Sequence, residues 1–356
     1  MTPELTWPAV LSTLLGRDDL SADAASWAMR QVMSGEASPS QVAGFVMALQ
    51  AKGVSVEELT GIAGEMLAHA RRIEVPGPSL DIVGTGGDRQ NTVNISTMSA
   101  MVASAAGATV VKHGNRAASS KSGTADCLEA LGVVLSLGPD GVVDVAREVG
   151  MTFCFAQDFH PSMRHAAGPR RELGVPTVFN LLGPLTNPAQ PSASAVGVAM
   201  EAAAPLIAGV FAERGSSAAV FRGRDGLDEI TVSTCTDVWW VAGGAVQRFV
   251  IDPAALGEAT FPLDDLRGGE PAENADVVRS LFDGDRSGRM AAVHLAVTLN
   301  AGAALAVLDD DGTVRDQSSF ETALRAGMDQ AAAAIDSGAA RDKLTAWADA
   351  TRRRAG

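Results

Sequence analysis

The sequence predicts an α/β fold in which a small all-helical domain is joined to a larger α/β domain with a mainly parallel central sheet. The length of 356 residues fits two domains at roughly 150 residues each. Apolar residues recur at helical spacing up to about residue 74, whereas from Leu80 short apolar runs alternate with helical stretches. Strands separated by helices of this length form parallel βαβ units.

Residues 1–74 contain predicted helices only. Ser21, Ser38 and Ser55 stand where helix N-caps belong, and Pro39 suits a first helical turn. The Val-Pro-Gly-Pro segment at 75–78 ends this helical region. A second helical stretch at about 168–190 is expected to join the same domain.

The α/β domain is expected over residues 79–167 and 191–350. Its first strands are predicted at residues 81–83, 109–111, 133–137 and 152–156, and its first helices at 96–107, 125–131 and 142–149. In parallel sheets, ligands bind at the carboxyl ends of the strands. Polar loops follow the first two strands, so the binding site is expected at that edge.

The composition of the chain limits the kinds of partner and the location that we expect for the protein. With 28 Lys+Arg against 42 Asp+Glu, the net charge of −14 disfavours binding to nucleic acid or to an anionic membrane. The start of the chain lacks the basic and apolar pattern of a signal peptide, and the Ala-rich stretches are too short to span a bilayer. Three dispersed cysteines without a C-x-x-C motif are typical of buried thiols in a reducing compartment. The sequence predicts a soluble, cytoplasmic protein.

A glycine-rich turn follows the first strand. Glycines at 84, 86 and 87, followed by Asp88, allow main-chain amides to approach phosphate oxygens. The turn matches neither a dinucleotide-binding fingerprint nor a P-loop, so by itself an ordinary tight turn is equally consistent. Hydroxyl and amide side chains then crowd the start of a helix, where they fit either an anion site or a simple N-cap: Asn91, Thr92, Asn94, Ser96 and Thr97.

A basic, hydroxyl-rich loop follows the second strand. It runs from Lys112 to Thr124 and contains the cations Lys112, Arg116 and Lys121. In an acidic protein such a loop indicates a phosphate or pyrophosphate site. A solvated loop without a ligand is the alternative.

Three further groups are candidates. Asp228 and Glu229 are adjacent carboxylates of the kind that hold Mg²⁺, although surface charge is the commoner role of such pairs. Arg170 has a planar group suited to a carboxylate ligand. His160 and His165 have no third ligand at metal-site spacing and are interpreted as structural histidines.

Taken together and in this order, these segments resemble the anthranilate phosphoribosyltransferase family. Four further motifs extend the resemblance: Phe-His-Pro at 159–161, Phe-Asn-Leu-Leu-Gly-Pro-Leu-Thr-Asn-Pro at 179–188, Leu-Asn-Ala at 299–301 and Ile-Asp-Ser-Gly at 335–338. It covers about residues 5 to 345. The resemblance implies a fold of the nucleoside phosphorylase/phosphoribosyltransferase class II type and a homodimer formed through the helical domain.

The resemblance also implies a reaction and a set of ligands. The reaction is transfer of the phosphoribosyl group of 5-phosphoribosyl 1-diphosphate (PRPP) to the amino group of anthranilate, a step of tryptophan biosynthesis that uses Mg²⁺, up to two ions per subunit. Ser96, Asp228 and Glu229 would contact the metal, while Gly84, Asn115 and Arg170 would bind anthranilate. The implied PRPP-binding residues are Gly84, Gly87, Asp88, Thr92, Asn94, Ile95, Ser96, Thr97, Lys112, His113, Gly114, Asn115, Arg116, Ala117, Ala118, Ser119, Ser120 and Thr124.

The chain departs from the family pattern at three positions. Arg89 stands where a glycine is common, Val93 where Phe is frequent, and Pro176 where many members carry Arg. Arg89 is expected to affect PRPP affinity or loop mobility. None of the three removes a matched ligand.

The expected chemistry is displacement at the ribose C1 carbon through an oxocarbenium-like state. Charge on the departing pyrophosphate is the main requirement, and Mg²⁺ with Lys112, Arg116 and Lys121 would meet it. The aromatic amine is neutral at pH 7, so no general base is assigned. The alternatives are a pyrimidine nucleoside phosphorylase and a non-enzymatic, nucleic-acid-binding relative of the same fold. The basic loop and the paired carboxylates argue against the first, and the net charge argues against the second.

Overall fold

The computed structural model describes residues 5–116 and 121–355. Within them the strands form one seven-stranded sheet in the order β3-β2-β1-β4-β5-β6-β7, parallel from β3 to β5 and antiparallel at β6 and β7. The strands are β1 (Leu80–Gly84), β2 (Val110–Gly114), β3 (Met151–Phe155), β4 (Ala193–Gly197), β5 (Ser217–Gly223), β6 (Thr236–Ala242) and β7 (Ala245–Ile251).

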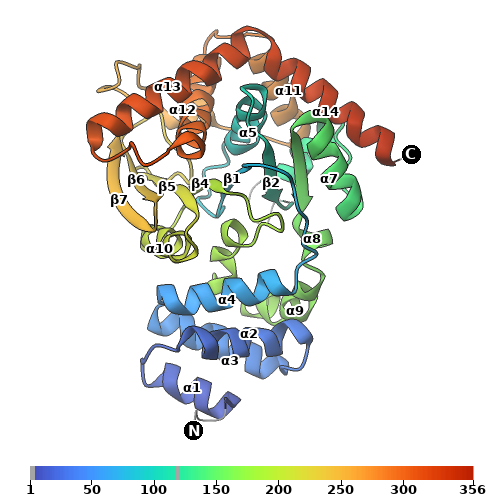
Figure 1. Ribbon diagram of the computed structural model, residues 1–356, viewed down its shortest axis with the longest axis vertical. Helices are drawn as coiled ribbons and strands as arrows, with labels where there is room; N and C mark the ends of the chain where they lie inside the picture. Colours follow the sequence, from blue (N-terminus) through green and yellow to red (C-terminus); the bar gives the residue numbers. More distant parts are fainter. Residues whose placement is uncertain (1–4, 117–120, 356) are drawn as a thin grey trace.

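The helical domain lies at one end of the molecule, beside a larger body built around the sheet (Figure 1). Its first four helices begin at Thr6, Ser21, Ser38 and Ser55, whose side chains accept N-cap hydrogen bonds. The predicted N-cap serines are thus confirmed. These helices are α1 (Trp7–Leu15), α2 (Ala22–Ser34), α3 (Pro39–Lys52) and α4 (Val56–Ala68).

A segment from the middle of the chain returns to these helices. Helix α9 contacts α2 and α3, and the short helix η2 contacts α3, whereas η3 contacts β1 and β2. The elements of this part are α8 (Ala156–Phe159), η1 (Pro161–Met163), α9 (Arg164–Leu173), η2 (Val178–Leu181) and η3 (Gly183–Leu185). The exact domain boundaries stay a prediction.

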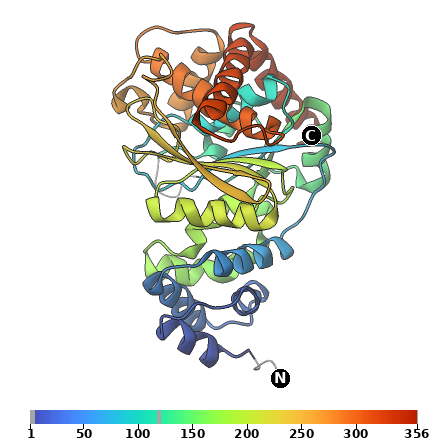
Figure 2. The ribbon, with the colours of Figure 1, turned by 60° about the vertical axis from the view of Figure 1, so that its left-hand side comes forward.

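Helices cover both faces of the sheet. α5 and α12 pack on one face, while α10 lies between the other face and α4 (Figure 2). The remaining elements are α5 (Ile95–Ala105), α6 (Thr124–Ala130), α7 (Gly138–Val149), η4 (Glu201–Ala203), α10 (Ala204–Arg214), η5 (Leu263–Leu266), α11 (Pro271–Phe282), α12 (Met290–Asp309), α13 (Gln317–Asp336) and α14 (Ala339–Ala355).

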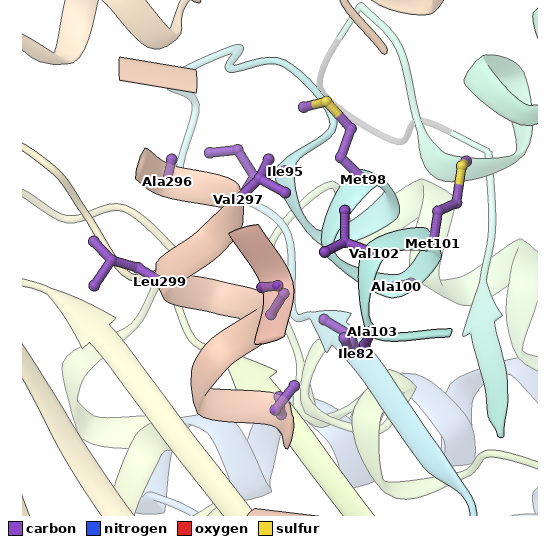
Figure 3. Packing of buried hydrophobic residues seen from close by; sticks show 14 of the residues in the cluster. Ile82, Ile95, Met98, Ala100, Met101, Val102, Ala103, Ala296, Val297 and Leu299 are labelled. Carbon is purple, nitrogen blue, oxygen red and sulfur yellow. The ribbon is translucent and has the colours of Figure 1, made fainter. Parts of the chain in front are cut away.

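Two large apolar clusters hold the layers together. One joins α5, α12 and their face of the sheet, and Figure 3 shows side chains of the two helices meeting there, Ile95 of α5 beside Val297 of α12. The other extends without a break from the helical domain through α10 to the opposite face of the sheet. Helix α12 is long and apolar enough to cross a membrane, but 83% of that stretch is buried. It is the core helix of this fold.

The strand predicted at residues 133–137 does not form. Val133 and Leu135 are buried in the core, but β2 pairs directly with β3 and leaves no place for a strand between them. The Val134 N–H donates to Thr351 Oγ1 of α14 instead of to a neighbouring strand. Helix α7 then begins at Gly138, four residues before the predicted start at Val142. A short apolar run indicates that its residues are buried, and burial alone does not make the run a strand.

Candidate active site

Three segments bring the predicted residues together at the carboxyl ends of the central strands. β1 ends at Gly84, β2 at Gly114 and β4 at Gly197, with β1 in the middle. The first loop (residues 85–94) leads from β1 to α5, and the second loop (residues 115–123) leads from β2 to α6. The acidic turn (residues 226–230) lies between β5 and β6. The edge predicted from the polar loops is the edge on which these segments meet.

The first loop bends through left-handed backbone. Gly86 and Gly87 have φ of 66° and 92°, and Arg89 has φ of 60°. Only glycine adopts such angles without strain, so the glycines are required by the turn and Arg89 occupies a position that favours glycine. The Gly86 N–H donates to Asp228 Oδ2 at 2.7 Å, which ties the first loop to the acidic turn.

The acidic turn can reach this edge because two strands end in glycine. An ideal Cβ on Gly84 would lie 2.7 Å from Asp228 Oδ2, and one on Gly197 would lie 1.7 Å from the Asp228 main-chain oxygen. Real Cβ atoms do not approach other atoms so closely. Asp228 and Glu229 are consequently buried, with 9% and 8% of their surface exposed.

Three carboxylates concentrate negative charge here. Burial, and next the charge and hydrogen bond of Asp88, raise the pKa of Asp228 to about 7. Burial and the charge of Asp228 also raise the pKa of Glu229 well above its usual range. No group of three acidic, His or Cys side chains in residues 5–116 and 121–355 is already arranged as a metal site. A divalent cation fits this donor set, because it would relieve the repulsion and take its remaining ligands from substrate phosphates and water.

The start of α5 contributes main-chain groups and one hydroxyl. Glu229 Oε1 accepts the Ser96 N–H at 3.0 Å, so Ser96 and Glu229 are adjacent as predicted for a shared ligand. Ile95 and Thr97 are buried, and Ile95 packs in the core (Figure 3), which leaves only their main chains for a substrate. Asn94 bonds to Ser122 of the second loop through Nδ2 at 3.2 Å. Thr92 forms an isolated bridge with Arg267.

Lys112 is placed differently from the expectation. Its ammonium group is buried, donates to Ile82 O and lies 3.4 Å from Ser96 Oγ. Burial lowers the pKa of Lys112, while the charges of Asp81 and Glu229 oppose that shift. Lys112 therefore supports the site from within the sheet instead of extending into the loop beside Arg116, because it lies inside β2 and not after it.

The second loop is described only at its two ends. Arg116 is paired with Asp126 at 2.9 Å and Glu129 at 2.6 Å, and its guanidinium lies 5.5 Å from the centroid of the Phe155 ring. Thr124 Oγ1 accepts a bond from Thr97 at 3.5 Å. The predicted ligands Ala117, Ala118, Ser119 and Ser120 lie outside the described residues. Lys121 is exposed.

His113 faces away from the carboxylates. Its Nδ1 lies 3.0 Å from the Gly183 oxygen, and its ring centroid lies 5.2 Å from that of His160. Burial, and next the charge of His160, lower the pKa of His113 to about 3; burial lowers that of His160 to about 4. Both rings are therefore neutral at pH 7. This placement is consistent with the interpretation of His160 as a structural histidine. His113 lies on the opposite face of β2 from Lys112.

Arg170 has a guanidinium available for a ligand. It lies on α9, 5.0 Å from the centroid of the Phe179 ring, and no carboxylate of the described residues lies within salt-bridge distance. Burial lowers the pKa of Arg170 from its ordinary value. Asn115, the other predicted anthranilate ligand, accepts a bond from Gln157 Nε2 at 3.4 Å. Gln157 carries no signal in the sequence that marks it for the site.

Three buried asparagines tie the site together through partners that the sequence did not predict. Asn187 Nδ2 donates to Asp81 Oδ2 and Val111 O, which links β1 to β2. Asn274 Nδ2 donates to Asn94 Oδ1 at 2.8 Å. Asn300 bonds to both main-chain groups of Ile230. Asn187 and Asn300 lie in motifs that carry the family resemblance, but such a motif does not name the partners of its side chains, and Asn274 carries no signal of this kind.

Comparison with known proteins gives the family. A family model described as glycosyl transferase family, a/b domain, matches residues 76–341, and one described as its helical bundle domain matches residues 8–70. Anthranilate phosphoribosyltransferases of Nocardioides sp. and Thermobifida fusca are each 56% identical to the chain, over 98% and 99% of it and 99% of each relative.

Solved structures agree with these relatives. Anthranilate phosphoribosyltransferase from Thermus thermophilus superposes with a TM-score of 0.86 at 38% identity, covering 96% of this chain and 99% of that one. The enzyme from Saccharomyces cerevisiae in complex with PRPP and Mg gives 0.85 at 28% identity over 98% and 99%. The predicted fold class and the predicted family are both confirmed. The chain belongs to the anthranilate phosphoribosyltransferase family and is, with it, a glycosyltransferase.

Proposed function

We propose that the chain carries out the reaction of its family at the edge formed by the two loops and the acidic turn. It transfers the phosphoribosyl group of PRPP to the amino group of anthranilate, giving N-(5-phosphoribosyl)anthranilate and pyrophosphate. The observation that carries the assignment is the burial of Asp228 and Glu229 against the glycine-rich first loop, which the Gly86 N–H ties to Asp228 Oδ2 at 2.7 Å.

PRPP is bound by main-chain amides more than by side chains. Gly84, Gly87 and the start of α5 present N–H groups at a strand end and a helix N-terminus, both suited to phosphate oxygens. Arg116 and Thr124 flank the other side of the site. Arg116 is now held by Asp126 and Glu129, so it exchanges or shares these partners when it meets a pyrophosphate.

Up to two Mg²⁺ ions per subunit are held by Ser96, Asp228 and Glu229. When bound, these ions would neutralise the negative charge on the departing pyrophosphate. Ser96 Oγ and the carboxylate oxygens are hard ligands of the kind that Mg²⁺ prefers. The buried ammonium group of Lys112 lies 3.4 Å from Ser96 Oγ and restrains that side chain.

Anthranilate is held by Gly84, Asn115 and Arg170. The Arg170 guanidinium faces the carboxylate of the substrate, a planar group that matches its donors. The amine of anthranilate is neutral at pH 7 and attacks without prior loss of a proton. The protein accordingly needs to position the two substrates and stabilise charge, and it needs no general base.

The decisive assay is the loss of anthranilate fluorescence when PRPP and Mg²⁺ are added to purified protein. A decay that stops with EDTA supports the proposal. Absence of decay, together with phosphorolysis of thymidine or uridine, would assign a pyrimidine nucleoside phosphorylase. Salt-sensitive retention on heparin with neither activity would instead favour the nucleic-acid-binding alternative.

We also propose a homodimer formed through the helical domain and a cytoplasmic location. Leu15 of α1 and Met47 of α3 are exposed apolar side chains on that domain, with 77% and 37% of their surface accessible. Cys127, Cys154 and Cys235 are free thiols, consistent with a reducing compartment. Light scattering after size exclusion tests the dimer, and Leu15→Glu is expected to shift it toward monomer. A monomeric parent protein would contradict it.

A further inference from the structure

Asn300 is fully buried on α12 and uses its whole amide on the acidic turn and its own helix. Its Oδ1 accepts the Ile230 N–H at 2.9 Å. Its Nδ2 donates to Ile230 O at 3.0 Å and to Ala296 O at 2.8 Å. The side chain thus pairs with both main-chain groups of one residue, as a neighbouring strand would. That residue directly follows Glu229.

Further hydrogen bonds link the acidic turn to α5 and link α5 to α12. Glu229 Oε1 accepts the Ser96 N–H in the first turn of α5. One turn further along α5, Ser99 Oγ donates to Val297 O of α12 at 3.3 Å. The two helices pack through apolar side chains such as Ile95 and Val297 (Figure 3). The last two residues of the acidic turn are therefore bonded to two helices, Glu229 to α5 and Ile230 to α12, and the Ser99–Val297 bond joins these helices to each other.

We infer that Asn300 is a positioning residue, which fixes the acidic turn so that Asp228 and Glu229 present their carboxylates together to the metal–PRPP complex. Asn300 touches neither substrate nor metal itself. The inference rests on the proposed function, since it takes Asp228 and Glu229 as the metal ligands. Groups that orient metal ligands typically change metal affinity by about 10- to 100-fold when they are removed.

The test is metal binding, separate from catalysis. Mn²⁺ replaces Mg²⁺, and free Mn²⁺ is measured by electron paramagnetic resonance in the presence of PRPP and without anthranilate. Asn300→Ala is expected to weaken Mn²⁺ binding by about 10- to 100-fold. Hydrogen exchange should accelerate in the peptide that contains Ile230, and the KM for anthranilate should stay near that of the parent protein.

A matched control separates positioning from damage to the helix. Thr298 lies two residues away on α12, is also buried, and its hydroxyl bonds only to His294 O and Leu295 O of the same helix. Thr298→Val is expected to leave Mn²⁺ binding unchanged. An equal loss in Thr298→Val would show that disturbing α12 is sufficient, and the inference would be wrong.

A second variant covers the case in which Asn300→Ala does not fold. Asn300→Asp keeps the volume and the acceptor for the Ile230 N–H but loses the two N–H donors. Its Mn²⁺ affinity is expected to lie below that of the parent protein, because a carboxylate oxygen would then face the carbonyl oxygens of Ile230 and Ala296. An affinity equal to the parent's would overturn the inference. If the parent protein itself shows no PRPP-dependent Mn²⁺ binding, the proposed metal site fails before Asn300 is in question.

Discussion

The main-chain oxygen of Asp228 occupies the space that a side chain at Gly197 would need, 1.7 Å from the position of an ideal Cβ. Gly197 of β4 pairs in register with Gly84 of β1, whose own Cβ would meet the Asp228 carboxylate. Two neighbouring strands thus end in glycine at the same level. The acidic turn packs directly against this pair of glycines.

Gly197→Ala is therefore expected to displace the acidic turn. We expect a loss of about 3 kcal/mol in the free energy of unfolding, the upper end for overpacking, or a folded protein without Mg²⁺-dependent activity. Urea unfolding and the fluorescence assay measure the two outcomes. Gly64 is a control, since it lies on α4 with no atom within 4 Å of an added Cβ. Gly64→Ala should keep activity and gain up to about 1 kcal/mol. A fully active and stable Gly197→Ala would contradict the packing described here.

Arg170→Ala is expected to weaken anthranilate binding selectively. A hydrogen bond to a charged group contributes about 1.5–3 kcal/mol, so the KM for anthranilate should rise about 10- to 100-fold while that for PRPP changes little. Steady-state kinetics with each substrate varied in turn measure both values. Arg171→Ala, at the exposed neighbour on the same helix, is the control and should match the parent protein. Equal rises in both KM values would remove the assigned role.

Asp228→Asn and Glu229→Gln are expected to change the response to Mg²⁺. Each loses a charge that helps to hold the ion, and kcat at a fixed, low Mg²⁺ concentration should fall by about 100-fold, with partial recovery as Mg²⁺ increases. A Mg²⁺ titration of the rate tests this. Asp311→Asn, at an exposed position on the loop after α12, provides a control for the loss of one charge. An unchanged titration curve in the first two variants would mean that these carboxylates do not bind the metal.

The stability of the protein should depend on pH through its buried histidines. Burial lowers the pKa of His160 to about 4, whereas an unfolded chain protonates histidine near 6.5. Between these values the unfolded state binds more protons, so the free energy of unfolding decreases as the pH falls. For His160 the decrease amounts to about 2 kcal/mol at pH 5.

His160→Gln isolates this effect. The variant should lose less stability than the parent protein between pH 7 and pH 5 in chemical unfolding experiments, whatever its stability at pH 7. Burial raises the pKa of Asp81 to about 6 and gives a contribution of the opposite sign between pH 4 and 6. Asp81 is present in both proteins, so its contribution cancels in the difference. Parallel pH profiles would show that His160 is not kept neutral by burial.

The sequence predicted those parts of the site that are continuous in the chain. The glycine turn, the basic loop and the acidic pair each combine their chemistry within a few residues, and all lie at the predicted edge. The sequence did not predict that the Lys112 side chain is buried within the sheet beside the site. The direction of a side chain depends on where its strand ends, and the sequence did not show that β2 continues past Lys112. Nor did it predict the partners of Asn300, since α12 is buried almost all round and shows no polar face.

The fold was predicted in class but not in every strand. The antiparallel pair β6 and β7 was missed, although two glycines with φ of 56° and 77° connect it and a Gly-Gly pair between β-prone runs indicates a hairpin. The strand predicted at residues 133–137 was wrong because its partner is distant in the chain. The main chain of this run bonds to Thr351 of α14, 217 positions after Val134, and no local pattern contains that partner.

The three buried asparagines also set the order in which the site can be completed during synthesis. They connect residues that are 106, 180 and 70 positions apart in the chain. The acidic turn can bond to Gly86 and Ser96 as soon as it is synthesised, whereas its bonds to Asn300 require α12. A chain truncated before α12 would therefore lack the bonds of Asn300 to the acidic turn.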